Sequence, residues 1–123
     1  MVFAKEIALS KKDRAFLRLA ALAAVQSTCA MQHGAVIVRS GSVLAIGWNK
    51  AKNGHIVFGN GELLCCTVHA EMDALRQVAS DTTNATMYVA RINNHGETRL
   101  SKPCESCARA LLDAGIKRVV YTS

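Results

Sequence analysis

The chain has 123 residues, of which 50% are hydrophobic and 20% are charged, and this length is typical of one domain with a single core. No apolar run approaches the roughly 18 residues that span a bilayer, and the N-terminus lacks the order of a signal peptide, so we expect a cytoplasmic protein that does not contact membranes. The formal net charge of +6 suits an anionic partner such as a nucleotide or nucleic acid, although solubility alone explains it equally well.

The first predicted elements are a helix and a hairpin. Ser10, followed three residues later by Asp13, resembles a capping box with a shortened acid, and it starts a helix that runs to about Thr28. The runs GAVIV (34–38) and VLAIGW (43–48) are rich in β-branched residues and predict two buried strands joined by a short turn.

Helices and strands alternate in the rest of the chain. A polar loop covers 49 to about 62, a helix is predicted over 68–80, and TMYVARI predicts a strand over 86–92. A further helix over 104–114 precedes a last strand over 117–121. This order implies a parallel crossover, so we expect an α/β fold with a mixed sheet of about four strands flanked by helices.

One histidine and two cysteines stand at predicted helix starts, in TVHAEMDAL and SKPCESC. The positive charge of a helix start lowers thiol pKa values and should hold Cys104 and Cys107 as thiolates. With the imidazole of His69 they form a ligand set that Zn²⁺ prefers, and three ligands leave a fourth position open for water. Glu71 can then face that water without being a ligand and can transfer its proton.

The pattern His-x-Glu followed by Pro-Cys-x-x-Cys resembles the signature of the zinc-dependent cytidine and deoxycytidylate deaminase superfamily. HGAVIV, GWN (47–49) and LLDAGIKRVVY extend the resemblance to nearly the whole chain. It implies a three-layer deaminase-like fold and one zinc deaminase-like domain over 1–123. The family commonly continues with a further strand and helix, which are lacking here. Either the pocket is therefore unusually open and admits a larger substrate, or a second subunit supplies the missing wall. We expect a homo-oligomer in which a second subunit covers the sheet edge.

The resemblance also implies an activity and further site residues. Asn49 would contact the sugar, the backbone of Ala70 the base, and the backbone near Lys102 would receive the amino group. Activated water would attack the ring carbon that bears the amine, so that ammonia leaves and a carbonyl remains. The implied substrate is cytidine, deoxycytidine or dCMP, although the sequence does not distinguish cytosine from adenine.

Two other functions stay open at this point. A deaminase that acts on tRNA or single-stranded DNA would suit the positive charge, but one Trp, two Tyr and three Phe offer few stacking platforms. A zinc-stabilised binding module without activity would use Cys66 as a fourth ligand and close the site to water. A closed site gives no reason for Glu71, so the sequence favours the open site.

Several polar residues near these motifs have ordinary interpretations. Asp73 is expected to be solvated or to stabilise its helix, and spacing alone names no partner for His33. Arg91, Arg99 and Lys102 flank the loop before the cysteines, where either a phosphate or a solvated loop would explain them.

Overall fold

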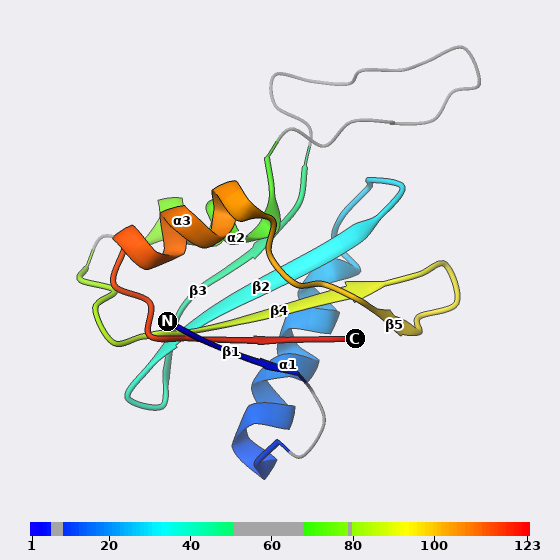
Figure 1. The fold of residues 1–123 in the computed structure, drawn as a ribbon. Helices are drawn as coiled ribbons and strands as arrows, with labels where there is room; N and C mark the ends of the chain where they lie inside the picture. Colours follow the sequence, from blue (N-terminus) through cyan, green and yellow to red (C-terminus); the bar gives the residue numbers. More distant parts are fainter. Residues whose placement is uncertain (6–8, 51–67, 79) are drawn as a thin grey trace.

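The computed structural model describes residues 1–5, 9–50, 68–78 and 80–123. In these ranges the chain folds into a sheet with helices on both of its faces (Figure 1). No helix among the described residues is long and apolar enough to cross a membrane. The elements in chain order are β1 (Val2–Lys5), α1 (Lys11–Ala24), β2 (Gln32–Arg39), β3 (Ser42–Trp48), α2 (Ala70–Gln77), β4 (Thr86–Ile92), β5 (Thr98–Arg99), α3 (Glu105–Asp113) and β6 (Arg118–Tyr121).

Within the described ranges the sheet has six strands. Five of them follow the order β1-β6-β4-β2-β3, and the short β5 pairs with β4 outside this path. β2 is antiparallel to both β3 and β4, whereas β4 with β6 and β6 with β1 are parallel pairs. The predicted α/β class and mixed sheet are confirmed. The expected number of about four strands is wrong, because β1 and β5 join the sheet as well.

The outer edge of β6 is covered by the first strand of the same chain. Val2–Lys5 runs parallel to Arg118–Tyr121, with Phe3 opposite Val119. The ring of Phe3 also meets Tyr121 edge-on, with ring centroids 6.4 Å apart. The expectation that the last strand leaves an open sheet edge is therefore wrong, and that edge gives no reason for a homo-oligomer.

Side-chain alternation along the strands divides the core into two layers. Odd-numbered positions of β2 and β4 pack beneath α2 and α3, and even-numbered positions pack against α1. Figure 1 shows α2 and α3 together on one side of the sheet and α1 on the other. On β2 and β4, odd-numbered side chains therefore face α2 and α3, and even-numbered side chains face α1.

Asp13 anchors α1 to the sheet through a largely buried ionic cluster. Its carboxylate accepts hydrogen bonds from the Arg118 guanidinium at 2.9 and 2.7 Å and from the Tyr88 hydroxyl at 2.6 Å. The Asp13 N–H donates to the Ser10 hydroxyl at 3.1 Å, so the predicted cap is confirmed. The helix ends at Ala24, earlier than expected.

We expect Asp13→Asn to destabilise the fold by about 1.5 to 3 kcal/mol at neutral pH, because the charge-assisted bonds from Arg118 are lost. The hydrogen bonds from Arg118 hold the pKa of Asp13 at about 2, below its ordinary 3.8. A carboxyl with a lowered pKa stabilises the fold above about pH 4, and this contribution is lost as the pH falls towards 2. Urea unfolding of both proteins at pH 7 and pH 3 should show a smaller difference at pH 3. An equal difference at both pH values would contradict this account.

Candidate active site

Two helix starts meet on the face of the sheet that α2 and α3 cover. His69 is the N-cap residue of α2 and Cys104 is the N-cap residue of α3, with Cys107 in the following turn. Neither N-cap side chain makes a capping hydrogen bond to its helix, although Ser, Thr, Asp or Asn usually does so at this position. Because neither side chain caps its helix, the imidazole of His69 and the thiol of Cys104 can both bind a shared metal ion.

The donor atoms of these three residues are spaced as ligands of one metal ion. His69 Nδ1 lies 3.2 Å from Cys107 Sγ and 3.8 Å from Cys104 Sγ, and all three atoms lie within 4.8 Å of one another. Nitrogen and sulfur at tetrahedral positions on zinc would be about 3.5 Å apart, given the usual bond lengths. Both the spacing and the donor types therefore fit zinc.

The two thiols have different pKa values. A hydrogen bond with the Ser106 hydroxyl lowers the pKa of Cys104 to about 7. Burial raises the pKa of Cys107 above its ordinary value. The lowering expected for both thiols thus holds only for Cys104, with Ser106 as its main cause. A bound cation favours the thiolate of Cys107, because the charge of a metal ion reverses the effect of burial.

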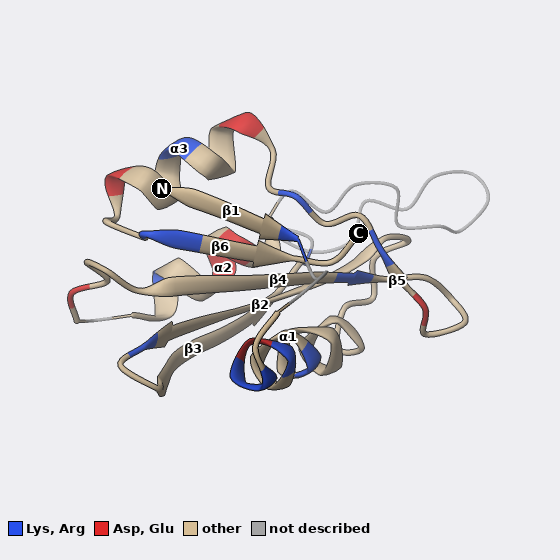
Figure 2. Cartoon of the chain, turned by 60° about the horizontal axis from the view of Figure 1, so that its bottom comes forward, with Lys and Arg blue, Asp and Glu red and all other residues tan. Residues whose placement is uncertain are grey.

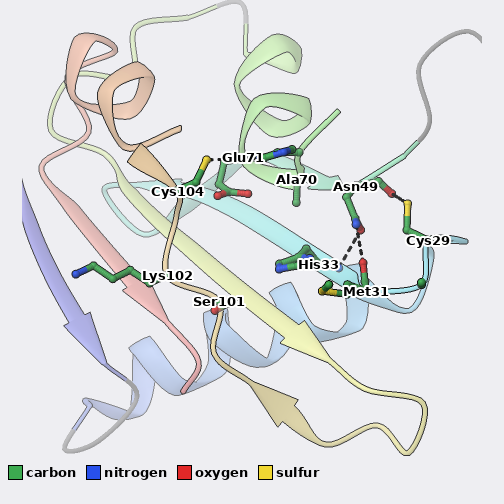
Figure 3. A pocket seen from close by; sticks show the side chains of 11 residues that line it. Cys29, Met31, His33, Asn49, Ala70, Glu71, Ser101, Lys102 and Cys104 are labelled. Atoms are coloured by element: carbon green, nitrogen blue, oxygen red, sulfur yellow. Dashed lines mark hydrogen bonds between the residues drawn. The ribbon is translucent and has the colours of Figure 1, made fainter. Parts of the chain in front are cut away.

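Glu71 lies in the first turn of α2 and is only 5% exposed. Figure 3 shows its carboxylate close to Cys104 at one end of a pocket. Burial raises the pKa of Glu71 above its ordinary value. A carboxyl whose neutral form is favoured in this way can take up a proton and release it again.

A cavity of about 410 Å³ opens beside Glu71, which is within the usual size range of small-molecule sites. All predicted site residues except Cys107 line it. Sequence reasoning did not assign the other members of its wall to the site. The complete lining is Cys29, Ala30, Met31, His33, Asn49, His69, Ala70, Glu71, Ser101, Lys102 and Cys104.

Asn49 joins the two walls at the far end of the cavity. Its Nδ2 donates to the Met31 carbonyl at 2.6 Å, and its Oδ1 accepts from the His33 N–H at 2.9 Å (Figure 3). The Ser27 hydroxyl donates to the Asn49 carbonyl at 2.9 Å. The amide therefore fixes the backbone of residues 31–33 as a pocket wall and is itself only 6% exposed.

Asp73 fixes the segment on either side of Asn49. It accepts a hydrogen bond from the Trp48 N–H at 3.2 Å and lies 3.1 Å from Lys50 Nζ. Its side chain is only 13% exposed, so Asp73 is not solvated. Its place in the first turn of α2 agrees with the other expectation, that it stabilises its helix. The helical turn of α2 directs this carboxylate to the end of β3, which the sequence pattern alone does not reveal.

Lys102 contributes to the pocket wall but directs its charge elsewhere. Its Nζ lies 5.1 Å from the centroid of the Phe3 ring, and Figure 3 shows the side chain extending away from Glu71. The preceding Ser101 donates from its hydroxyl to the Val89 carbonyl and from its N–H to the Thr122 carbonyl, both at 2.9 Å. These bonds hold the segment before Cys104 against the sheet.

Cys66, the alternative fourth ligand, lies outside the described residues, as does most of the predicted loop. The described residues contain two free cysteines, Cys104 and Cys107. Together with His69 they are the described group that could hold a metal ion.

Comparison with known proteins identifies the family. Residues 10–123 match the family described as the cytidine and deoxycytidylate deaminase zinc-binding region. The chain belongs to this family. It is 31% identical over 128 residues to the deoxycytidylate deaminase of Mycobacterium phage D29, a match that covers 89% of this chain and 92% of that protein. The predicted superfamily and its zinc requirement are therefore confirmed.

Further relatives are longer proteins. The chain is 32% identical over 116 residues to ComE operon protein 2 of Bacillus subtilis, of which it covers 56%. It is 31% identical over 125 residues to the deoxycytidylate deaminase of Saccharomyces cerevisiae, of which it covers 37%. This chain therefore spans only part of the length of these two relatives.

Solved structures show the same fold. A dCMP deaminase from the cyanophage S-TIM5 in its apo form superposes with a TM-score of 0.70 at 26% identity, covering 92% of this chain and 84% of that chain. The same enzyme in complex with dCMP and dUMP gives a TM-score of 0.72 at 24% identity, covering 94% and 85%. The predicted deaminase-like arrangement of sheet and helices is confirmed.

Proposed function

We propose that this protein is a zinc-dependent hydrolytic deaminase that converts dCMP to dUMP and ammonia. The observation that carries the proposal is the buried Glu71 beside the group of His69, Cys104 and Cys107, at one end of a cavity of about 410 Å³. The deoxycytidylate deaminase of phage D29, which the chain matches over most of both lengths, supports this choice of substrate.

His69, Cys104 and Cys107 are the metal ligands in this proposal. Two thiolates and one imidazole leave one position of a tetrahedron open. When bound there, zinc supplies Lewis-acid activation of the water that attacks the base.

Glu71 moves the protons. Its carboxylate takes the first proton from the attacking water and delivers it to the ring nitrogen. It then takes the second proton, from the newly attached hydroxyl group, and delivers it to the departing amine. A bond forms between the water oxygen and the ring carbon that bears the amine, and the bond from that carbon to nitrogen breaks. Water and dCMP thus become dUMP and ammonia, and Glu71 ends in its starting state.

Asn49, Ala70 and Lys102 form the substrate-binding surfaces of the proposal. The Asn49 amide, already fixed by Met31 and His33, has hydrogen-bonding capacity left for the sugar. The backbone of Ala70, at the start of α2, faces the base. The backbone at Lys102 receives the amino group, since its side chain is directed towards Phe3.

The alternative functions are not favoured. Three relatives, from phage D29, Saccharomyces cerevisiae and Schizosaccharomyces pombe, are named deoxycytidylate deaminases, which argues against both a binding module and a deaminase of tRNA or single-stranded DNA. A cytoplasmic location and a homo-oligomer stay predictions. The exposed apolar side chains of Leu22 on α1 and of Val25, the residue that follows α1, rather than a sheet edge, now support the homo-oligomer.

Ammonia release from a panel of substrates tests the proposed function. Zinc-loaded protein is expected to deaminate dCMP with a higher kcat/KM than deoxycytidine, cytidine, adenosine or oligo(dC). No ammonia from any substrate, with one zinc bound per chain, would refute a catalytic function. Adenosine as the best substrate would refute the assignment to cytosine.

A further inference from the structure

Strand register places three basic side chains in one row. His33 on β2 is directly opposite Arg91 on β4, and Arg91 is directly opposite Arg99 on β5. Residues directly opposite each other in antiparallel strands point to the same face of the sheet. All three side chains therefore share one face.

This face is the one that carries the candidate active site. Ala35 and Val89 belong to the core beneath α2 and α3, and His33 and Arg91 lie two positions from them on the same strands, so they face the same way. His33 lines the cavity. Figure 2 shows Lys and Arg on the adjoining ends of β4 and β5. The row therefore begins in the cavity wall and leads outward across the sheet.

Among the described residues, little negative charge balances Arg91 and Arg99. Like charges directly opposite each other destabilise a strand pair. Within the described ranges, Arg99 pairs with Glu97 at 3.7 Å, and both side chains are about half exposed or more, so this ion pair contributes little. In the part of the chain that the structure describes, no carboxylate lies within ion-pair distance of Arg91. An anion from outside the chain would relieve the repulsion.

We infer that Arg91 and Arg99 bind the 5′-phosphate of the substrate, with His33 between the phosphate and the base site. This inference rests on the proposed deaminase function. Phosphate binding by the two arginines would make the protein selective for a nucleoside monophosphate over a nucleoside. Guanidinium groups suit the role because their planar N–H donors match phosphate oxygens in pairs. Burial chiefly, together with the charge of Arg91, lowers the pKa of His33, which leaves this ring a neutral hydrogen-bonding group.

A mononucleotide fits the row better than a polynucleotide. A single strand usually stacks its successive bases on aromatic side chains. Four of the described aromatic residues pack in or against the two core layers: Phe3, Phe16, Tyr88 and Tyr121. The Trp48 ring has Lys50 Nζ 4.7 Å from its centroid. The described surface beside the row therefore offers little stacking area.

The test compares dCMP with deoxycytidine in Arg91→Ala and Arg99→Ala. Each change is expected to lower kcat/KM for dCMP by about 10- to 100-fold, the effect of losing hydrogen bonds to a charged group. The kcat/KM for deoxycytidine should stay unchanged. Arg91→Lys should be intermediate, because it keeps the charge but loses the paired donors. Arg18→Ala is the matched control, since Arg18 is an exposed arginine on α1, across the sheet, and it should change neither value.

Calorimetry with zinc-loaded protein separates this inference from the proposed function. The protein should bind dUMP more tightly than deoxyuridine, and the double variant of Arg91 and Arg99 should lose that preference. This result would support the phosphate site even if no substrate were deaminated. The inference would be overturned if the arginine variants lost kcat/KM equally for dCMP and deoxycytidine, or if their dCMP kinetics were unchanged. It would also be overturned if the parent protein bound dUMP no more tightly than deoxyuridine. Tighter binding of oligo(dC) than of dUMP, lost in the double variant, would overturn it in favour of a polynucleotide.

Discussion

Glu71→Gln is expected to lower kcat for dCMP by about 10²- to 10⁴-fold, the usual contribution of a general acid and base. The amide has the size of the carboxyl group but cannot accept and release the proton. Because burial already favours the neutral form of Glu71, a neutral amide should cost little stability. Initial rates of the variant measure catalysis, its zinc content measures metal binding, and its thermal unfolding measures stability.

Glu105→Gln provides the matched control for this experiment. Glu105 also lies in the first turn of a helix that begins at a candidate metal ligand, but its side chain is exposed. The control should keep its activity, its zinc and its melting temperature. A folded, zinc-loaded Glu71→Gln protein with full activity would refute the proton-transfer role of Glu71.

The metal-binding motifs could be predicted because their geometry is local. His69 and Glu71 are set by one helix start, and Cys104 and Cys107 by another, so short spacings determine how each pair is presented. That the two helix starts meet in space follows from the fold. The sequence supplied this only through its resemblance to a known family.

The longer strands were predictable for a similar reason. A run of apolar and β-branched residues bounded by turn residues marked the strand over 86–92, and the structure has the same bounds at Thr86–Ile92. β1 and β5 have four and two residues. Strands this short carry no clear pattern and are defined by the neighbours with which they pair.

Contacts between distant parts of the chain could not be predicted. Asp13 and Arg118 are 105 positions apart, and nothing in either local sequence names the other. The row of His33, Arg91 and Arg99 likewise depends on the register of two strand pairs. A shift of one residue in either pair would turn a side chain to the other face.

One zinc ion per chain is expected in protein purified without a chelator, and His69→Ala should remove it. The change deletes one of three donors that lie within 4.8 Å of one another. The His69 side chain makes no cap hydrogen bond to α2, so its loss should cost the helix little directly. A lower melting temperature should therefore come from the missing metal, because a ligand that binds only the folded state stabilises it.

His95→Ala is the control, since His95 is an exposed histidine in the turn between β4 and β5. It should keep one zinc per chain, the parent melting temperature and full activity. Adding chelator should lower the melting temperature of the parent and of His95→Ala to a similar extent. The same addition should leave His69→Ala unchanged, because that variant has no zinc to lose. The ligand assignment would be contradicted if His69→Ala kept one zinc per chain or if the parent protein held none. The open coordination position, on which the proposed deamination depends, would then be contradicted as well.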